Sequence, residues 1–320
     1  MKKYNVLPLV LVLPLLVGCG QKDIKAPKFA KEGDKVEYSA FNDAMNEINK
    51  EHAFFKSEED YLLPSFKANI KEESLNKTEL KRENKVHRSE LNYSKKTTLG
   101  EYDKANGILH EKVETKGNAG GEAAQGYEKA EETRKTEIYR QKGSDEGKDY
   151  LINVNVPNRT YALGSEVTEL SPYDKLIDNK AASIATRNNA VFAFAFMMMA
   201  YSLADEEEQA KFSFYKNDKI FTLEYKDEKK GEEVKDAEDK VKWTIDESMD
   251  VKFQIDLSKS DSYKATYYSV ETESTNYNIV YDYCVPGDVE IETKKQLIVA
   301  EVAQKDISLK AQDLAKFTKI

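Results

Sequence analysis

The chain has 320 residues, with 49 basic and 58 acidic side chains and a formal net charge of −9. An acidic surface repels phosphate backbones, so the charge argues against nucleic acid as a partner. Two cysteines, Cys19 and Cys284, leave no intrachain disulfide once Cys19 is modified as described below, so the fold must depend on a hydrophobic core.

The first eighteen residues have the pattern of an export signal. Two lysines precede an apolar run of about twelve residues, which is too short to span a bilayer. The run ends in Leu16-Val17-Gly18-Cys19, which resembles the bacterial lipobox, in which the cysteine receives a diacylglyceryl thioether and becomes the first residue. An uncleaved anchor or an ordinary signal peptide fits less well, because no Ala-x-Ala-like site precedes Gly20. We expect cleavage between Gly18 and Cys19 and lipidation of Cys19.

The acyl chains on Cys19 would be the only membrane partner of the mature protein. Without the two lysines the chain has 47 basic and 58 acidic residues, a net charge of −11, which disfavours electrostatic docking on anionic lipid. We therefore expect a lipid-anchored protein on the extracytoplasmic face of the cell membrane. Residues 19–36 are expected to form a flexible tether, and residues 37–320 a single domain.

The first half of this domain contains an expected helix and several expected strands. A helix is predicted from Ser39 to about Phe55, because Phe41, Met45 and Ile48 fall on one face. Weaker strand signals run from about Lys81 to Thr136, with a glycine-rich loop over residues 117–126. A clearer hairpin follows, in which residues 150–156 and 160–163 flank a turn at Pro157-Asn158.

A second helix is predicted from Ser171, a cap residue followed by proline, to about Glu208, with a break at Asn188-Asn189. The last third of the chain has the strongest strand pattern. Five segments are expected to be strands of an antiparallel meander, and a short helix is expected near residues 307–317; the strand segments are 212–214, 220–225, 251–257, 263–270 and 277–285.

This order of elements predicts an α+β fold. We expect a curved, half-barrel-like antiparallel sheet packed against the N-terminal helix and against a buried central apolar helix. The central helix would be Ala190–Ala204, fifteen residues that are apolar on every side and too few to cross a membrane.

The central helix is also the expected ligand site. Its Phe and Met side chains form a soft surface that suits varied apolar ligands, or else they only fill the core. The candidate lining residues are Phe192, Phe194, Phe196, Met197, Met198 and Met199.

No pattern in the chain predicts catalysis. The three histidines (His52, His87 and His110) lack zinc-ligand spacing, and Cys284 has no neighbouring base in sequence. A nucleophile elbow, a phosphate loop and a calcium loop are also missing from the sequence. We expect a non-enzymatic protein with neither a metal site nor a cofactor.

The layout resembles that of the LolA/LppX-like lipoproteins, which combine a lipobox, a polar tether, an early helix and a sheet interrupted by helices. The segment from Tyr277 to Ile291 is similar to the last strand and exit of that group. The resemblance implies a half-open barrel that holds acyl chains or other apolar ligands between sheet and helices. Binding of an apolar or lipid-like ligand is the expected function, and a structural or protein-interaction role at the cell surface is the alternative.

Overall fold

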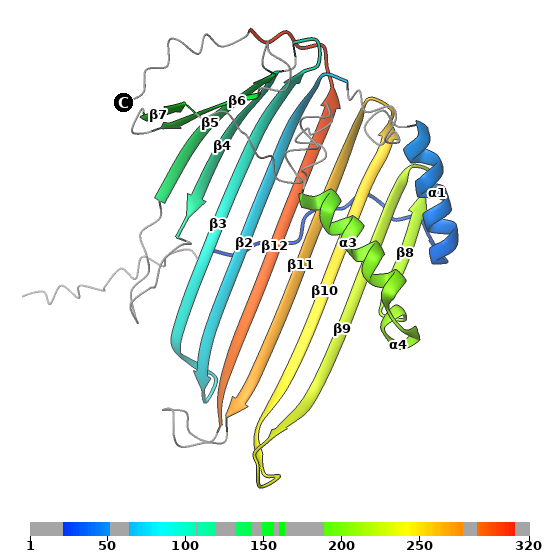
Figure 1. Cartoon of the computed structure of the whole chain (residues 1–320). Coiled ribbons are helices and arrows are strands. Elements are labelled where there is room, and N and C mark those ends of the chain that lie inside the picture. The colour runs from blue at the N-terminus through cyan, green and yellow to red at the C-terminus, as the bar shows by residue number, and fades with distance from the viewer. Residues whose placement is uncertain are drawn as a thin grey trace, which may run out of the picture.

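Within the residues that the structure describes, twelve strands form one antiparallel sheet in the computed structural model (Figure 1). The described residues are 22–51, 64–106, 108–118, 132–142, 149–156, 160–163, 189–277 and 287–310. Across the sheet the strands follow the order β1-β8-β9-β10-β11-β12-β2-β3-β4-β5-β6-β7. Most neighbours are therefore consecutive in the chain, but β12 lies between β11 and β2 and joins the two halves of the sequence.

Six strands are unusually long, at 16 to 19 residues, and they form the centre of the sheet. They are β2 (Phe66–Arg82), β3 (Lys85–Asp103), β9 (Ile220–Lys235), β10 (Val241–Lys259), β11 (Ser262–Tyr277) and β12 (Asp288–Gln304). The shorter strands are β1 (Asp34–Val36), β4 (Ile108–Gly117), β5 (Glu132–Lys142), β6 (Asp149–Val156), β7 (Thr160–Leu163) and β8 (Phe212–Asn217). The helices are α1 (Tyr38–Glu51), α3 (Asn189–Leu203) and α4 (Glu206–Gln209).

Several predicted hairpins are confirmed. β6 pairs with β7, β8 pairs with β9 across the turn that follows Asn217, and β10 pairs with β11. The alternating residues of β10 (Val251, Phe253, Ile255 and Leu257) are all buried, as the period of two predicts. By contrast, β2 begins at Phe66, well before the expected position; Phe66, Ala68 and Ile70 alternate and are buried, and charged residues on both faces follow only from Lys71 onward.

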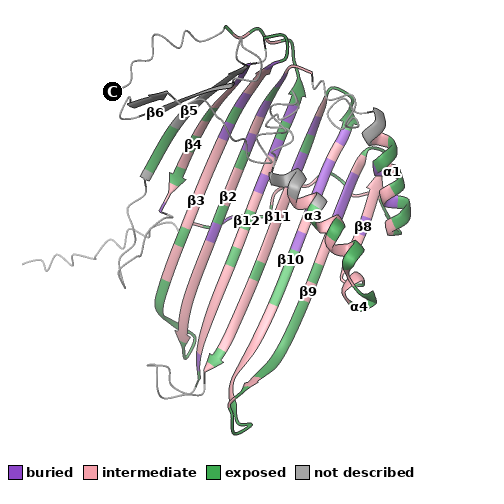
Figure 2. Ribbon diagram, viewed as in Figure 1, coloured by how far each residue is buried: buried purple, intermediate pink, exposed green. Residues whose placement is uncertain are grey.

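The hydrophobic core lies between one face of the sheet and the helices α1 and α3. Phe41 and Met45 of α1 pack with buried residues of β8, β9, β10, β11, β12 and β2. Figure 2 shows the buried residues concentrated toward the end of the strands that carries these helices. We call the face of the sheet that packs against α1 and α3 the helix face.

Away from the core, the long strands continue as a part of the sheet that few other residues cover. Pairs of oppositely charged side chains lie on this part. Lys95 lies 2.7 Å from Glu73 and Lys96 lies 3.1 Å from Glu72, both pairs joining β2 and β3. Neighbouring opposite charges on adjacent strands stabilise a sheet modestly, by about 0.2–1 kcal/mol for each pair.

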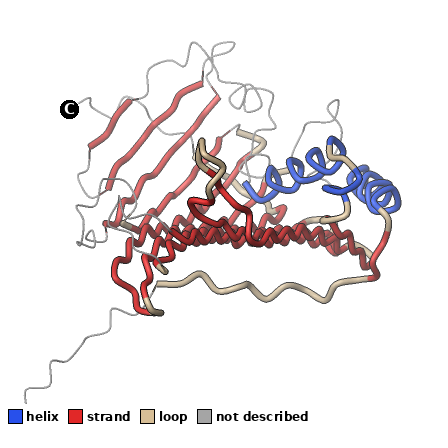
Figure 3. The backbone as a smooth tube through the Cα atoms, turned by 90° about the horizontal axis from the view of Figure 1, so that it is seen from below, coloured by secondary structure: helices blue, strands red, loops and turns tan. Residues whose placement is uncertain are grey.

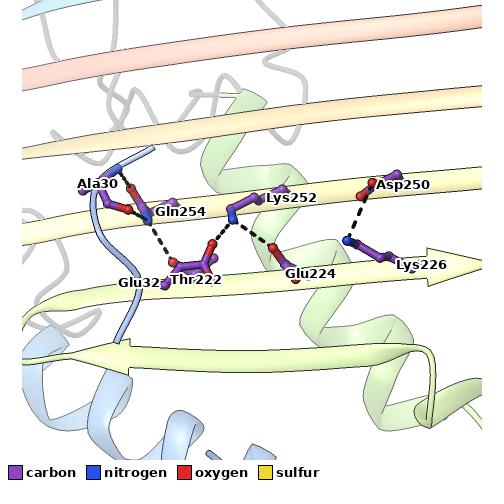
Figure 4. Close-up of polar contacts among 8 residues, drawn as sticks. All are labelled: Ala30, Glu32, Thr222, Glu224, Lys226, Asp250, Lys252 and Gln254. Carbon is purple, nitrogen blue, oxygen red and sulfur yellow. Dashed lines mark hydrogen bonds and ion pairs between the residues drawn. The ribbon is translucent and has the colours of Figure 1, made fainter. Parts of the chain in front are cut away.

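Residues 22–33 cross the sheet on the face opposite the helices (Figure 3). We call this segment the strap and this side the strap face. Ile24 is only 1% exposed, and Asp23 lies 2.7 Å from Lys295 of β12. At the other end Ala30 forms two hydrogen bonds with Gln254 of β10 (Figure 4). The sequence predicts a flexible tether here, but the described part of the segment is held against the sheet.

The predicted α+β fold with a buried central helix is wrong. The molecule is mainly one extended antiparallel sheet, and its three described helices are short. Helix α3 packs on the sheet by one side only and leaves Phe196 and Leu203 exposed. The prediction failed because an apolar sequence indicates only that a helix favours burial. It does not determine whether another part of the fold covers the outer side of that helix.

Two further helix predictions differ from the structure. The predicted helix over residues 171–208 is seen as α3 and α4, separated at Ala204-Asp205, and residues 171–188 lie outside the described residues. Residues 307–310 of the expected C-terminal helix are not helical, and its remainder is also outside the described part. Among the helices described, none combines the length and the apolar character needed to cross a membrane.

Candidate functional site

Helix α3 lies obliquely across the helix face of the sheet (Figure 1), and contacts between aromatic rings hold it there. The ring of Phe194 stacks on that of Phe253 of β10, with 4.4 Å between centroids. Two turns further along, Tyr201 contacts Phe214 of β8 at 5.0 Å and Tyr38 of α1 at 4.3 Å. Direct ring contact therefore joins α3 to both the sheet and α1.

The inner side of α3 follows the helical period. Phe194, Met197, Met198 and Tyr201 all pack against the core, at the spacing of i, i+3, i+4 and i+7. The end of the helix is held as well, since the Gln209 side chain donates to the carbonyls of Tyr201 and Ala204 at 3.2 and 3.0 Å. These bonds satisfy carbonyl groups that the last turn of a helix otherwise leaves unpaired.

The outer side of α3 carries a second apolar row. Phe196, Met199 and Leu203 are 65%, 52% and 80% exposed, and their spacing places them on one side of the helix. We call these three residues the apolar strip. Single exposed apolar residues are common on protein surfaces, but adjacent large ones mark interaction sites.

Acidic side chains adjoin the apolar strip. Asp205, Glu206 and Glu207 follow α3 directly and are exposed, and no basic residue occurs between Ala190 and Ala210. We call these three residues the acidic frame. Apolar and negatively charged groups together define the chemistry of this surface.

Glu208 does not belong to the frame, because it anchors α4 to the sheet. Its carboxylate accepts a hydrogen bond from the Tyr225 hydroxyl at 2.7 Å and lies 2.5 Å from the Lys211 ammonium. The hydrogen bonds from Lys211 and then Tyr225 lower the pKa of Glu208. Lys211 also lies 3.2 Å from Asp227 of β9. This cluster holds the acidic end of α3 in place.

The structure divides the residues predicted to line a ligand site. Phe194, Met197 and Met198 face the core, whereas Phe196 and Met199 point outward. The side chain of Phe192 lies outside the described set, as do Gly18 and Cys19 of the lipobox. The six residues therefore do not line one common surface. Sequence reasoning missed Leu203 and the acidic frame, although the acidic run after Ala204 was a visible signal.

Those of the other candidate residues that the structure describes do not assemble a catalytic centre. His87 is exposed in β3, and His110 of β4 has its Nδ1 3.9 Å from Glu101. His52 and Cys284 are outside the part of the chain that is described. Over the described residues, no group of three or more His, Cys, Asp or Glu side chains is placed to hold a metal ion.

A concave region lies on the strap face. It has a volume of about 800 Å³ and extends over six adjacent strands, from β10 to β4. We call it the hollow. Its lining includes Lys67, Asn69, Leu99, Glu101, Lys264 and Glu301. The sequence pattern gave no indication of this region, because its residues come from distant parts of the chain.

Comparisons with known proteins identify no relative of this chain by sequence and only weakly similar solved structures. No family model matches the chain, and no curated protein matches it. The solved structures with some likeness include a deltaS2 mutant of the TodX monoaromatic hydrocarbon channel, with a TM-score of 0.24 and 7% identity over 79% of this chain and 94% of that one. The toluene transporter TodX of P. putida has a TM-score of 0.20 and 7% identity, over 76% and 91% of the two chains.

The outer membrane protein OprG from Pseudomonas aeruginosa has a TM-score of 0.14 and 6% identity, over 76% of this chain and 97% of that one. TM-scores this low carry no argument about fold, ligand or mechanism. The expected location, lipid-anchored at the cell membrane, receives no support from these structures, which include an outer membrane protein and channel proteins.

Proposed function

We propose that the protein is a non-enzymatic binding protein that engages a basic, amphipathic partner through the apolar strip of α3. The observation that carries this proposal is the combination of three large exposed apolar side chains with a firmly packed inner side of the same helix. A rigid helix loses little conformational entropy when a partner docks on it, so the exposed row is well suited to recognition.

The chemistry of the partner follows from the acidic frame. A partner whose apolar face covers Phe196, Met199 and Leu203 brings its flanking groups close to Asp205, Glu206 and Glu207. Basic groups at those positions gain electrostatic complementarity, whereas acidic groups are repelled. An amphipathic helix with Lys or Arg beside its apolar face meets both requirements.

Two synthetic helices test the proposal, one of Leu and Lys and one of Leu and Glu in the same amphipathic pattern, each about 15 residues long. The Leu/Lys peptide should bind and the Leu/Glu peptide should not, as measured by isothermal titration calorimetry. Phe196→Ser combined with Leu203→Ser should weaken binding by about tenfold or more, which corresponds to about 1.4 kcal/mol.

Controls separate specific docking from general attraction to an acidic protein. Val86→Ser removes an apolar side chain that is 49% exposed on β3, and it should leave binding unchanged. Glu206→Gln with Glu207→Gln should weaken binding more than Glu232→Gln with Glu233→Gln, which removes the same charge from exposed residues of β9. Equal binding by the strip variant and the wild type would refute the proposal.

A second candidate is the binding of a lipid-like ligand between α3 and the sheet. It is favoured by the half-buried Met197 and Met198, since methionine side chains adapt to varied apolar shapes. Native mass spectrometry of the Cys19→Ser protein should then detect a co-purified lipid. Absence of lipid together with binding of the Leu/Lys peptide would leave the first candidate alone.

Lipidation of Cys19 is also part of the proposal, and the lipobox supports it. The mature protein should begin at Cys19 and carry the mass of the diacylglyceryl group, as measured by mass spectrometry of its N-terminal peptide. Cys19→Ser should abolish the added mass. An unmodified peptide that still contains residues 1–18 would contradict the lipobox assignment.

A further inference from the structure

The hollow lies on the strap face, where the protein already holds one extended polypeptide. The Gln254 side chain accepts a hydrogen bond from the Ala30 amide at 2.8 Å and donates one to the Ala30 carbonyl at 3.1 Å (Figure 4). A single carboxamide thus recognises both backbone polar groups of one residue. Because the strap crosses the strands rather than extending the sheet, side chains supply these bonds.

Charged and apolar contacts complete the binding of the strap. Glu32 of the strap pairs with Lys252 of β10, which also lies 2.8 Å from Glu224 of β9. The same ammonium makes a cation–π contact with Phe29, 4.9 Å from the ring centre, and Ile24 of the strap is buried. The strap face therefore holds a polypeptide with a carboxamide, paired charges and an apolar contact.

The hollow presents the same three kinds of group. Asp256 is two residues beyond Gln254 and so faces the same side, and the register continues from it through Lys264, Glu301 and Asn69 to Leu99. Lys264 lies 3.5 Å from Glu301. On the next row, Lys67 pairs with Glu101.

The middle of the hollow is neutral. There the Asn69 carboxamide lies beside Leu99, which is 49% exposed. The Asn69 Oδ1 atom is buried and accepts no hydrogen bond from the described residues. A buried acceptor without a donor is unfavourable, and the carboxamide that carries it belongs to the lining of the hollow.

We propose that the hollow binds an extended polypeptide segment that crosses the strands as the strap does. Asn69 would pair with a peptide group of this ligand as Gln254 pairs with Ala30, and Leu99 would contact an apolar side chain. Six strands span about 24 Å, which about seven extended residues cover. The charge pairs at Lys264–Glu301 and Lys67–Glu101 then face charged side chains on either side of the neutral centre.

This site is independent of the apolar strip, because it lies on the opposite face of the sheet. The probe is a phage-displayed library of random peptides of about twelve residues, selected on the full chain. Enriched sequences are then synthesised and titrated by calorimetry. We expect peptides whose binding is weakened about tenfold by Asn69→Leu, the loss that corresponds to about 1.4 kcal/mol.

Asn76→Leu is the matched control. Asn76 also lies in β2 and also has a buried Oδ1 without a partner among the described residues, but it does not line the hollow. Binding should survive this change. Hydrogen exchange on the wild-type chain provides a second measurement, in which bound peptide should protect amides of 256–264 and 301–303. The proposal would be overturned if no peptide is enriched, or if Asn69→Leu binds the peptides as tightly as the wild type does. Protection of amides elsewhere in the chain would overturn it as well.

Discussion

At the scale of single residues, Asp103 shows how one buried carboxylate organises an end of the sheet. It accepts hydrogen bonds from the Leu309 amide at 2.7 Å and from the Asn106 side chain at 2.7 Å. Burial acts to raise the pKa of Asp103, but the bonds from Leu309 and Asn106 outweigh it and lower the pKa. The carboxylate thus connects the turn after β3 to the C-terminal segment.

Asp103→Asn should lower the free energy of unfolding by about 1–3 kcal/mol, because buried donors lose a charged acceptor. A lowered pKa in the folded state stabilises the protein above the unfolded pKa of about 3.9, and this contribution is lost as the pH falls through the folded value. Chemical denaturation should therefore show a difference between wild type and variant that shrinks at acid pH.

The exposed Asp250, which lies 3.9 Å from Lys226, offers a control for Asp103. Asp250→Asn should change stability by less than about 0.5 kcal/mol. A difference between Asp103→Asn and wild type that stays constant down to about pH 2 would show that the carboxylate charge is not responsible.

At the scale of secondary-structure elements, β10, β11 and β12 bring three glutamates together on the helix face. Glu247 is directly opposite Glu273, which is directly opposite Glu292. Lys229 lies 3.8 Å from Glu247, and Lys294 lies 3.5 Å from Glu292. Glu273, the middle residue, forms no ion pair or hydrogen bond with the described residues. Like charges directly opposite each other destabilise a sheet.

Glu273→Gln should accordingly stabilise the protein, by about 0.2–1 kcal/mol in thermal or chemical denaturation. The gain should decrease at high salt, since ions screen the repulsion between exposed charges. Glu224→Gln, which removes the partner of Lys252 at 2.8 Å, should have the opposite effect. Loss of stability in Glu273→Gln would show that repulsion in this row is unimportant.

At the scale of the whole molecule, a single sheet carries different surfaces on its two faces. The helix face bears the core, the apolar strip and the acidic frame, and the strap face bears the strap and the hollow. Strap contacts reach from Lys22, whose ammonium lies 5.3 Å from the Tyr93 ring of β3, to Glu32 beside β10. The strap thereby links strands that are distant in the sheet.

Ile24→Ala tests whether the strap is part of the fold. Ile24 is buried, so this change should lower the free energy of unfolding by about 1–3 kcal/mol and make the strap more sensitive to trypsin. Lys28→Ala, at an exposed strap position, should leave stability unchanged. If residues 22–33 act only as a tether, both variants will unfold as the wild type does.

Much of the local structure could be predicted from the sequence, because its signals lie within a few residues. The alternation in β10 and the turn after Asn217 each indicate a hairpin without reference to the rest of the chain. The start of β2 was missed although Phe66, Ala68 and Ile70 alternate, because the run is only three apolar residues long before charged residues occupy both faces of the strand. The candidate site was predicted only to the level of its helix.

By itself, the sequence determined the lipobox pattern, the apolar helix and the pairing of neighbouring strands. Only the tertiary structure decided that β12 pairs with β2, that the strap lies on the sheet, and that Phe194 faces inward while Phe196 faces outward. The reason is physical. A helix that is apolar on every side gives no preference for one orientation, and contacts between distant segments depend on packing that no local pattern encodes.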